Sequence, residues 1–268
     1  MLLLNLFIIF VFGTIIGSFL NVVILRYNTG LSIVTGRSRC FSCGKDLNWY
    51  ELVPLFSFLF LRGKCSACKS KISYQYFIVE LLTAIIFSGL FLKFGLTPIL
   101  PIYFVIASLL IVMAVYDFKH KIIPDGMVFT FILFSVFVFL YTHTFSNIFS
   151  YPTSLDLLAG PILFSFFAFF WLVSLGKWMG FGDAKLAIGV GFLLGFSGGV
   201  YSIMLAFWIG AGFSLLIMFL QKIKMACLRR QAGFSKLSLK SEIPFAPFII
   251  LSVFIQIFTS WTLNSIIF

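Results

Sequence analysis

The protein has 268 residues, of which 61% are hydrophobic, 19% aromatic and only 10% charged, and its mean hydropathy is +1.13. Soluble domains carry about a quarter charged residues, so this composition excludes a soluble globular protein and indicates one that crosses a membrane several times. The net charge of +11 is compatible with nucleic-acid binding. The basic residues lie in the loops between the apolar segments, so membrane topology accounts for the positive charge. No nucleic-acid partner is predicted.

Apolar segments of the length needed to cross a bilayer follow one another along the chain. A helix needs about 20 mostly apolar residues to span the hydrocarbon core. The block 184–220 is interpreted as two crossings joined by a tight turn at 197–199 (Ser-Gly-Gly), because a single crossing would place the basic segment 221–243 opposite every other basic loop. The sequence therefore predicts an all-α polytopic membrane protein with about eight transmembrane helices, at 2–25, 77–93, 98–116, 126–143, 157–176, 184–197, 199–220 and 246–266.

Lys and Arg divide very unevenly between the two sides that these spans define. One, Lys93, lies on one side, and 18 lie on the other, in 26–76, 117–125, 177–185 and 221–243. The positive-inside rule places the basic side in the cytoplasm, where it favours contact with anionic lipid headgroups. Three parts are expected: a first transmembrane helix at 1–25, a cytoplasmic loop domain at 26–76 and a seven-helix membrane domain at 77–268.

The loop domain contains two C-x2-C pairs, Cys40 with Cys43 and Cys65 with Cys68. Each pair can occupy two corners of a tetrahedron, so together they predict a four-cysteine zinc site. Two disulfides are the alternative, which the reducing cytoplasm disfavours. Four protein ligands leave zinc no open position, so its expected role is structural. The apolar segment 52–61 between the pairs is too short to span and is expected on the membrane surface or under the zinc site.

Two aspartates stand at the ends of expected spans. Asp117 ends the third span and Asp183 opens the sixth, so the topology places both at the cytoplasmic face, at similar depth. Ionisable groups at membrane depth are costly and are functional candidates by default. Taken singly, each could be a helix-end or capping residue. Taken together they predict aspartyl-protease chemistry, in which one carboxylate activates a water and the other protonates the carbonyl oxygen.

Other polar residues have simpler expected roles. Gly180 and Gly182 are expected to leave room beside Asp183 for a substrate backbone. Asp125 is expected to cap the helix that begins near residue 126, and Lys185 to extend to the membrane interface. Solvated surface positions are expected for three further carboxylates, Asp46, Glu51 and Asp156.

A membrane transporter is the alternative function. In it, Asp117, Asp183 and Glu80 would form a proton or cation relay along helices broken by glycine. A relay would place carboxylates at several depths, whereas the two aspartates are expected at one face. A membrane zinc protease is excluded because the sequence has no H-E-x-x-H motif. The aspartate pair therefore favours a peptidase.

The motifs together resemble the bacterial type IV prepilin peptidases, also called leader peptidases, among the GxGD-type membrane aspartyl proteases. Tyr116-Asp117 with "GFGD" at 180–183 resembles the "YD…GxGD" pattern of that class. The resemblance extends over nearly the whole chain, through "GSFLNVVILR" at 17–26, the loop with its two C-x2-C pairs, "ISYQYFIVELL" at 72–82, "DFKHKIIPD" at 117–125 and "MGFGDAKL" at 179–186.

The resemblance implies the activity, the partners and the location. The expected reaction is cleavage after a glycine in the basic leader of prepilin or pseudopilin precursors, at the cytoplasmic face of the bacterial inner membrane, with Asp117 and Asp183 as catalytic residues. Members with the four-cysteine loop usually also N-methylate the new amino terminus using S-adenosylmethionine. Glu80 matches a glutamate of the family's second helix, which makes it a candidate for binding this cofactor; a hydrogen-bonded packing role is the alternative. No glycine-rich dinucleotide-binding motif independently indicates the methyltransferase.

Overall fold

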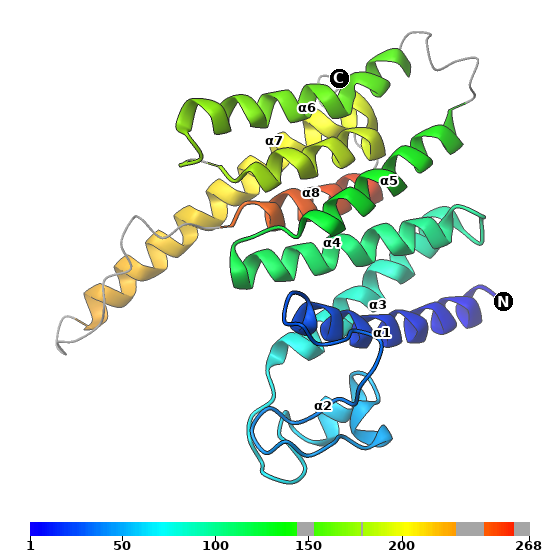
Figure 1. Ribbon diagram of the computed structural model, residues 1–268, viewed down its shortest axis with the longest axis vertical. Helices are drawn as coiled ribbons and strands as arrows, with labels where there is room; N and C mark the ends of the chain where they lie inside the picture. The colour runs from blue at the N-terminus through cyan, green and yellow to red at the C-terminus, as the bar shows by residue number, and fades with distance from the viewer. Residues whose placement is uncertain (144–152, 178, 229–243, 260–268) are drawn as a thin grey trace. The chain divides into compact units, whose positions relative to one another are not determined.

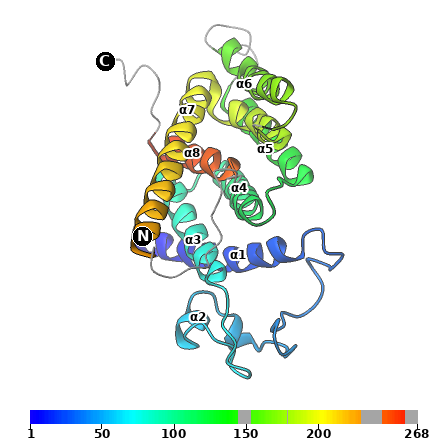
Figure 2. The ribbon, with the colours of Figure 1, turned by 90° about the vertical axis from the view of Figure 1, so that its left-hand side faces the viewer.

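The computed structural model describes residues 1–143, 153–177, 179–228 and 244–259, and these residues form helices and loops without a named strand (Figures 1 and 2). The expected basic segment 221–243 and the last expected span therefore lie partly outside the described residues. Two compact units, Met1–Tyr116 and Asp117–Phe268, divide the chain inside α4. The elements are α1 (Leu2–Arg26), the 3-10 helix η1 (Trp49–Leu52), α2 (Phe56–Phe60), α3 (Tyr74–Phe94), α4 (Leu100–His120), α5 (Asp125–Thr142), α6 (Thr153–Ser174), α7 (Phe181–Leu228) and α8 (Ala246–Thr259).

Six of the described helices are long and apolar enough to cross a membrane: α1, α3, α4, α5, α6 and the Phe181–Leu220 part of α7. That part of α7 has 40 residues, about twice what one crossing needs. Helix α7 is interrupted at Gly195, where the backbone is not helical. If its parts before and after Gly195 are counted separately and the shorter apolar α8 is added, the described residues have eight apolar helices as candidates for the predicted spans. The prediction of an all-helical polytopic membrane protein is confirmed.

The long helix α7 doubles back on itself at Gly195. This residue has φ +71° and ψ −177°, which no helical residue adopts. A Cβ atom on Gly199 would lie only 3.6 Å from the Cα atom of Gly191, whereas residues eight apart in a straight helix are about 12 Å apart. The two arms therefore run side by side as a helical hairpin (Figure 1).

The hairpin confirms two apolar arms in 184–220 but places their junction differently from the sequence prediction. The predicted turn at Ser197 is wrong, since the second arm is already helical there. The reason is Asp156 in the first turn of α6, whose carboxylate accepts a 2.7 Å hydrogen bond from the backbone N–H of Phe196. The first backbone N–H groups of a helix have no acceptor within that helix, and this bond supplies one at the start of the second arm. A negative charge is also favourable at that end of a helix. The expectation that Asp156 is a solvated loop residue is therefore also wrong.

Replacing the hinge glycine is expected to destabilise the second unit. In Gly195→Ala, the new Cβ atom would lie 2.6 Å from Oδ1 of Asp156, and the backbone conformation alone costs about 1–3 kcal/mol for a non-glycine residue. Gly212→Ala is the matched control, because Gly212 lies in the same helix with no neighbour within 4 Å of the added atom. We expect a lower thermal midpoint in detergent for Gly195→Ala and an equal or slightly higher midpoint for the control, because alanine favours the helix more than glycine does. Equal midpoints would contradict the hinge.

In the first unit, glycines bring α1 against α3. A Cβ atom at Gly13 would lie 2.7 Å from the Cα atom of Ala84, and one at Gly17 would lie 2.7 Å from that of Glu80. Small residues allow such close backbone approach between membrane helices. The amide of Asn21 joins the same two helices, because its Nδ2 donates 3.2 Å bonds to the carbonyl oxygens of Gly17 and Tyr76. The loop between α1 and α3, blue to cyan, forms a lobe of its own in both views (Figures 1 and 2).

In the second unit, α7 packs against α5, α6 and α8. Glycines again set the closest contacts, since a Cβ atom at Gly191 would lie 2.5 Å from the backbone nitrogen of Gly160 on α6. The ring of Phe131 on α5 occupies the space that a side chain at Gly189 would need. This packing fixes the first arm of α7, and with it the position of Asp183 near its start.

Candidate metal centre and acidic pair

The four predicted cysteine ligands meet in the lobe. The sulfur atoms of Cys40, Cys43, Cys65 and Cys68 all lie within 4.8 Å of one another, and the Cys40 and Cys68 sulfurs are 3.8 Å apart. Zinc bound tetrahedrally at about 2.3 Å would separate its sulfur ligands by about 3.8 Å. None of the four is in a disulfide. The geometry therefore fits a tetrahedral metal ion and favours it over the disulfide alternative.

Each C-x2-C pair lies in the same kind of turn. In the first, the backbone nitrogen of Cys40 bonds to the Lys45 carbonyl and Gly44 bonds back to the Cys40 carbonyl. In the second, Cys65 bonds to Ser70 and Lys69 bonds back to Cys65. Gly44 and Lys69 occupy the same place and both have positive φ, +71° and +58°. Two equivalent turns thus present two sulfurs each to one centre.

The thiols need a cation to ionise together. Backbone hydrogen bonds from Cys43 and Ser42 hold the pKa of the Cys40 thiol at about 6, below its ordinary value. The Lys45 backbone N–H lowers the pKa of Cys43, but the adjacent sulfurs of Cys40 and Cys68 outweigh it and raise that pKa to about 11. Four thiolates at these distances repel one another unless a metal ion neutralises them. This supports metal binding as the purpose of the cluster.

Glu51 joins the two turns and was missed by sequence reasoning, which placed it on the solvated surface. Its side chain is 1% exposed and forms an ion pair of 3.2 Å with Lys45 from the first turn. It also accepts hydrogen bonds from the hydroxyl of Ser66 in the second turn and from the backbone N–H of Asn48. The Asn48 bond, followed by Ser66, holds the pKa of Glu51 below its ordinary value. The signal in the sequence was the N-x-x-E capping pattern at 48–51.

Replacing this buried carboxylate is expected to loosen the metal site. Glu51→Gln keeps the shape but puts an amide nitrogen against Lys45 and Ser66, which should cost about 1–3 kcal/mol. The pKa of Glu51 is lower in the folded protein than in the unfolded chain. Its contribution to the stability of the lobe is therefore complete at pH values above the pKa of the unfolded chain, and it is lost as the pH falls through the pKa of the folded protein. The measurement is the rate of metal loss to a chelator from the full-length protein. Asp46→Asn, which breaks only exposed pairs with Arg39 and Arg37, is the control; equal rates for both variants would refute the role.

The second candidate site contains the two aspartates. Asp183 is the third residue of α7 and is 7% exposed. Its carboxylate accepts a hydrogen bond from the backbone N–H of Gly180, and its own N–H donates to the Gly180 carbonyl at 3.1 Å. This is the returning half of a capping box, which holds the carboxylate at the positive end of the helix.

Asp117 is held in a related way by a different helix. It lies one turn before the end of α4 and is 5% exposed. Its carboxylate accepts a hydrogen bond from the backbone N–H of Ala246, the first residue of α8. The two aspartates are close enough to interact electrostatically. Both carboxylates are thus buried in the same unit, and each is anchored by one backbone amide; their role as an acid–base pair stays a prediction.

The glycines beside Asp183 have different neighbours from those expected. A Cβ atom at Gly182 would lie 3.1 Å from two side-chain carbons of Ile123, so this glycine makes room for the segment after α4. A Cβ atom at Gly180 would meet, among the described residues other than its chain neighbours, only Asp183 at 3.6 Å and the backbone nitrogen of Gly182 at 4.0 Å. The expectation of space for a substrate backbone therefore remains for Gly180 alone.

Asp125 and Lys185 pair with each other. Lys185 donates a 2.7 Å hydrogen bond to Oδ1 of Asp125 and lies over the rings of Phe129 and Phe181. Asp125 is the first residue of α5, whose cap position is Pro124, so the prediction that it caps the helix is wrong. The ion pair ties the start of α5 to the start of α7, near Asp183.

Glu80, the predicted cofactor residue, is buried on α3 in the first unit. Its Oε2 accepts a 2.8 Å hydrogen bond from the backbone N–H of Leu55, and it also has a hydrogen bond with Ser18. These bonds agree with the alternative role of Glu80, that of a hydrogen-bonded packing residue. Its binding of a cofactor stays a prediction.

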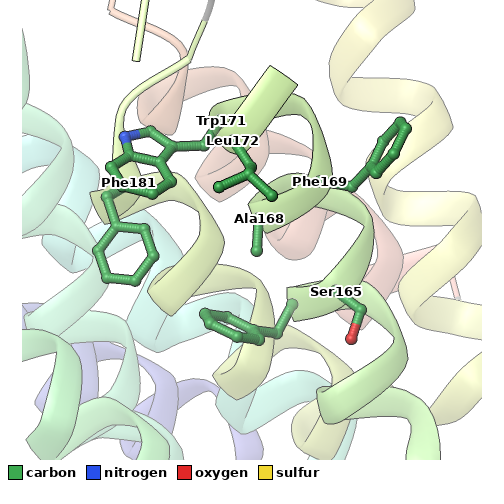
Figure 3. A pocket seen from close by; sticks show the side chains of 7 residues that line it. Ser165, Ala168, Phe169, Trp171, Leu172 and Phe181 are labelled. Carbon is green, nitrogen blue, oxygen red and sulfur yellow. The ribbon is translucent and has the colours of Figure 1, made fainter. Parts of the chain in front are cut away.

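An apolar groove lies along α6 beside the start of α7 (Figure 3). It has a volume of about 340 Å³. The indole of Trp171 and the ring of Phe181 are 5.0 Å apart at one end of it. Phe181 is the first residue of α7, so the groove includes the start of the helix that carries Asp183. The lining residues are Phe164, Ser165, Ala168, Phe169, Trp171, Leu172 and Phe181.

Two family models match the chain. The bacterial peptidase A24 N-terminal domain matches residues 11–94, which include the four cysteines and Glu80. The type IV leader peptidase family matches residues 104–215, which include both aspartates. No solved structure matches the chain. Neither family model supports the transporter alternative.

Curated relatives agree with these models, and three of them share the name prepilin leader peptidase/N-methyltransferase. The chain is 37% identical over 188 residues to the protein of Bacillus subtilis, covering 70% of this chain and 73% of that one. It is 28% identical to the Pseudomonas aeruginosa protein over 91% of this chain and 87% of that one. The Myxococcus xanthus protein is 47% identical over 119 residues, 44% of this chain and 36% of that protein. The chain therefore belongs to the type IV leader peptidase family.

Proposed function

We propose that the protein is an aspartyl endopeptidase that cleaves the basic leader of type IV prepilin-like or pseudopilin precursors after a glycine. The observation that carries the proposal is the pair of buried carboxylates, Asp117 and Asp183, inside the segment that matches the leader peptidase family. The names of the relatives supply the substrate class. The reaction takes place at the cytoplasmic face of the bacterial inner membrane, since the positive-inside rule assigns that side to the basic loops.

The pair acts by general acid–base catalysis. Two neighbouring carboxylates in a partly dry site share one proton, so one is ionised and the other is protonated. The ionised carboxylate takes a proton from water as the water oxygen bonds to the peptide carbonyl carbon, and the protonated one gives its proton to the carbonyl oxygen. Collapse of this intermediate breaks the C–N bond, and the leaving amine takes a proton from the pair. The amides of Gly180 and Ala246 orient the two carboxylates.

The surroundings of the pair suit a precursor with a basic leader and an apolar helix. The ionised member of the pair attracts the leader, while the groove of α6 offers an apolar surface that includes Phe181, the first residue of α7. The chain lies in the bilayer, so the apolar part of the substrate reaches this surface without leaving the membrane.

The test is cleavage of a full-length precursor by the purified protein in detergent or in a bilayer. Mass spectrometry should show one new amino terminus, directly after the leader glycine. Substituting that glycine by a bulky residue should prevent cleavage. An intact precursor, or cleavage elsewhere, would overturn the proposed substrate.

The proposal extends to zinc in the four-cysteine site and to N-methylation of the new amino terminus. The sulfur geometry fits zinc, which would hold the two turns together and leave no position for substrate. S-adenosylmethionine would supply the methyl group, with Glu80 as the candidate contact, as the relatives' names suggest methyl transfer. Adding the cofactor to the cleavage assay should increase the product mass by one methyl group. A product of unchanged mass would limit the activity to proteolysis.

A further inference from the structure

An apolar segment in the lobe exposes its large side chains. The segment Leu52–Leu61, called the strap below, contains the end of η1 and the five-residue helix α2. Phe56, Leu59 and Phe60 are 61%, 59% and 83% exposed, respectively. Such a cluster of exposed aromatic and aliphatic side chains marks an interaction surface.

The inner side of the strap is fastened to α3 at two points. The buried carboxylate of Glu80 accepts the 2.8 Å hydrogen bond from the backbone N–H of Leu55. Leu55 has φ +60°, an unfavourable value for a branched residue, so the packing around it must hold this conformation. The ring of Phe58 lies 5.5 Å from the rings of both Tyr74 and Phe77 in the first turn of α3.

These contacts place the strap at the edge of the bilayer. Helix α3 is a membrane span of 21 residues, about 32 Å long at 1.5 Å per residue, so nearly its whole length is needed to cross a hydrocarbon core of about 30 Å. Tyr74 therefore lies close to the boundary of that core. Glu80 is six residues further along, about 9 Å deeper, and the strap reaches it at Leu55.

The charges next to the strap suit a lipid surface. Arg62 and Lys64 follow it directly, and the segment 26–76 has eight Lys and Arg residues against two carboxylates. Both carboxylates already have partners within the lobe, Asp46 with Arg39 and Glu51 with Lys45. Neither carboxylate pairs with Arg62 or Lys64, and these two cations beside the strap are the kind of basic residue that anionic headgroups attract.

We infer that the strap is an interfacial membrane anchor, whose outer side chains insert into the leaflet at which α3 begins. An amphipathic segment in the interface buries its apolar face about 5–10 Å deep, which matches the depth set by Leu55 and Glu80. The anchor holds the four-cysteine lobe against the bilayer. The inference is independent of the proposed peptidase activity.

Photocrosslinking from the two sides of the strap tests the anchor. A photoreactive phenylalanine analogue is placed at Phe60, on the outer side, or at Phe58, on the inner side, in the full-length protein. The protein is reconstituted in nanodiscs of phosphatidylethanolamine and phosphatidylglycerol, and its adducts are identified by mass spectrometry. We expect lipid adducts from position 60 and, from position 58, crosslinks within the chain to the start of α3. Metal content and elution volume equal to those of the unsubstituted protein confirm that each variant is folded.

Three outcomes would overturn the inference: no lipid adduct from position 60, equal lipid adducts from both positions, or crosslinks from position 60 to a second protein chain. Two variants at Glu80 then test the fastening. Glu80→Gln retains an oxygen that can accept from the Leu55 N–H, so the crosslinks from position 58 should persist. Glu80→Leu removes the acceptor, and these crosslinks should be lost; their persistence would refute the role of Glu80 in holding the strap.

Discussion

Asp117→Asn and Asp183→Asn should each reduce precursor cleavage by about 10²–10⁴-fold, the usual contribution of a positioned acid or base. An asparagine oxygen can still accept the hydrogen bond from Ala246 or Gly180 that each carboxylate receives in the structure. The substitutions therefore remove the exchangeable proton and the charge while leaving the helix starts capped. Loss of activity with an unchanged thermal midpoint would assign the defect to chemistry and not to folding. The measurement is the initial rate of product formation at saturating precursor.

Asp125→Asn is the matched control for these variants. Asp125 begins α5 and pairs with Lys185, so it is an acidic residue of the same unit. Its side chain is 61% exposed, and such pairs contribute only about 0–1 kcal/mol to stability. We expect it to retain most activity. If either pair variant retains wild-type cleavage, the acid–base assignment is wrong; if all three lose activity equally, the effect is not specific to the pair.

Loss of one cysteine ligand is expected to unfold the lobe around the metal site. Cys65 is 2% exposed and is the most buried of the four. Cys65→Ser should abolish stoichiometric metal binding, because a structural zinc site loses most of its affinity with one ligand, and the bound ion contributes on the order of 10 kcal/mol to folding in small zinc domains. Metal content by mass spectrometry and protease sensitivity of the segment 26–76 measure the two effects.

Cys227→Ser is the control for that substitution. Cys227 is the fifth cysteine in the sequence and lies outside both C-x2-C pairs. Its replacement should leave both the metal content and the protease pattern unchanged. Metal content retained in Cys65→Ser would refute the four-cysteine site, and a disulfide would instead show as sensitivity to reductant in the absence of chelator.

The sequence by itself determined the features that depend on composition and local spacing. Apolar runs of about 20 residues predict membrane helices because the bilayer core requires that length, whatever the neighbours are. Two C-x2-C pairs predict a metal site because each pair can present both sulfurs within one turn. The cluster of Cys40, Cys43, Cys65 and Cys68 confirms this. The carboxylates at helix ends, Asp117 and Asp183, were likewise candidates from their positions alone.

Only the tertiary structure decided which distant residues meet. Asp156 holds Phe196, 40 positions away, so the α7 hairpin bends at Gly195 and not at the Ser-Gly-Gly sequence that follows it. Lys185 lies 60 positions from Asp125 and pairs with it. The sequence does not reveal such partners. A carboxylate on the surface and a carboxylate that bonds to the start of a distant helix can have the same neighbours in the sequence. The depth of a residue in the bilayer limits its chemistry, but packing between helices selects its partner.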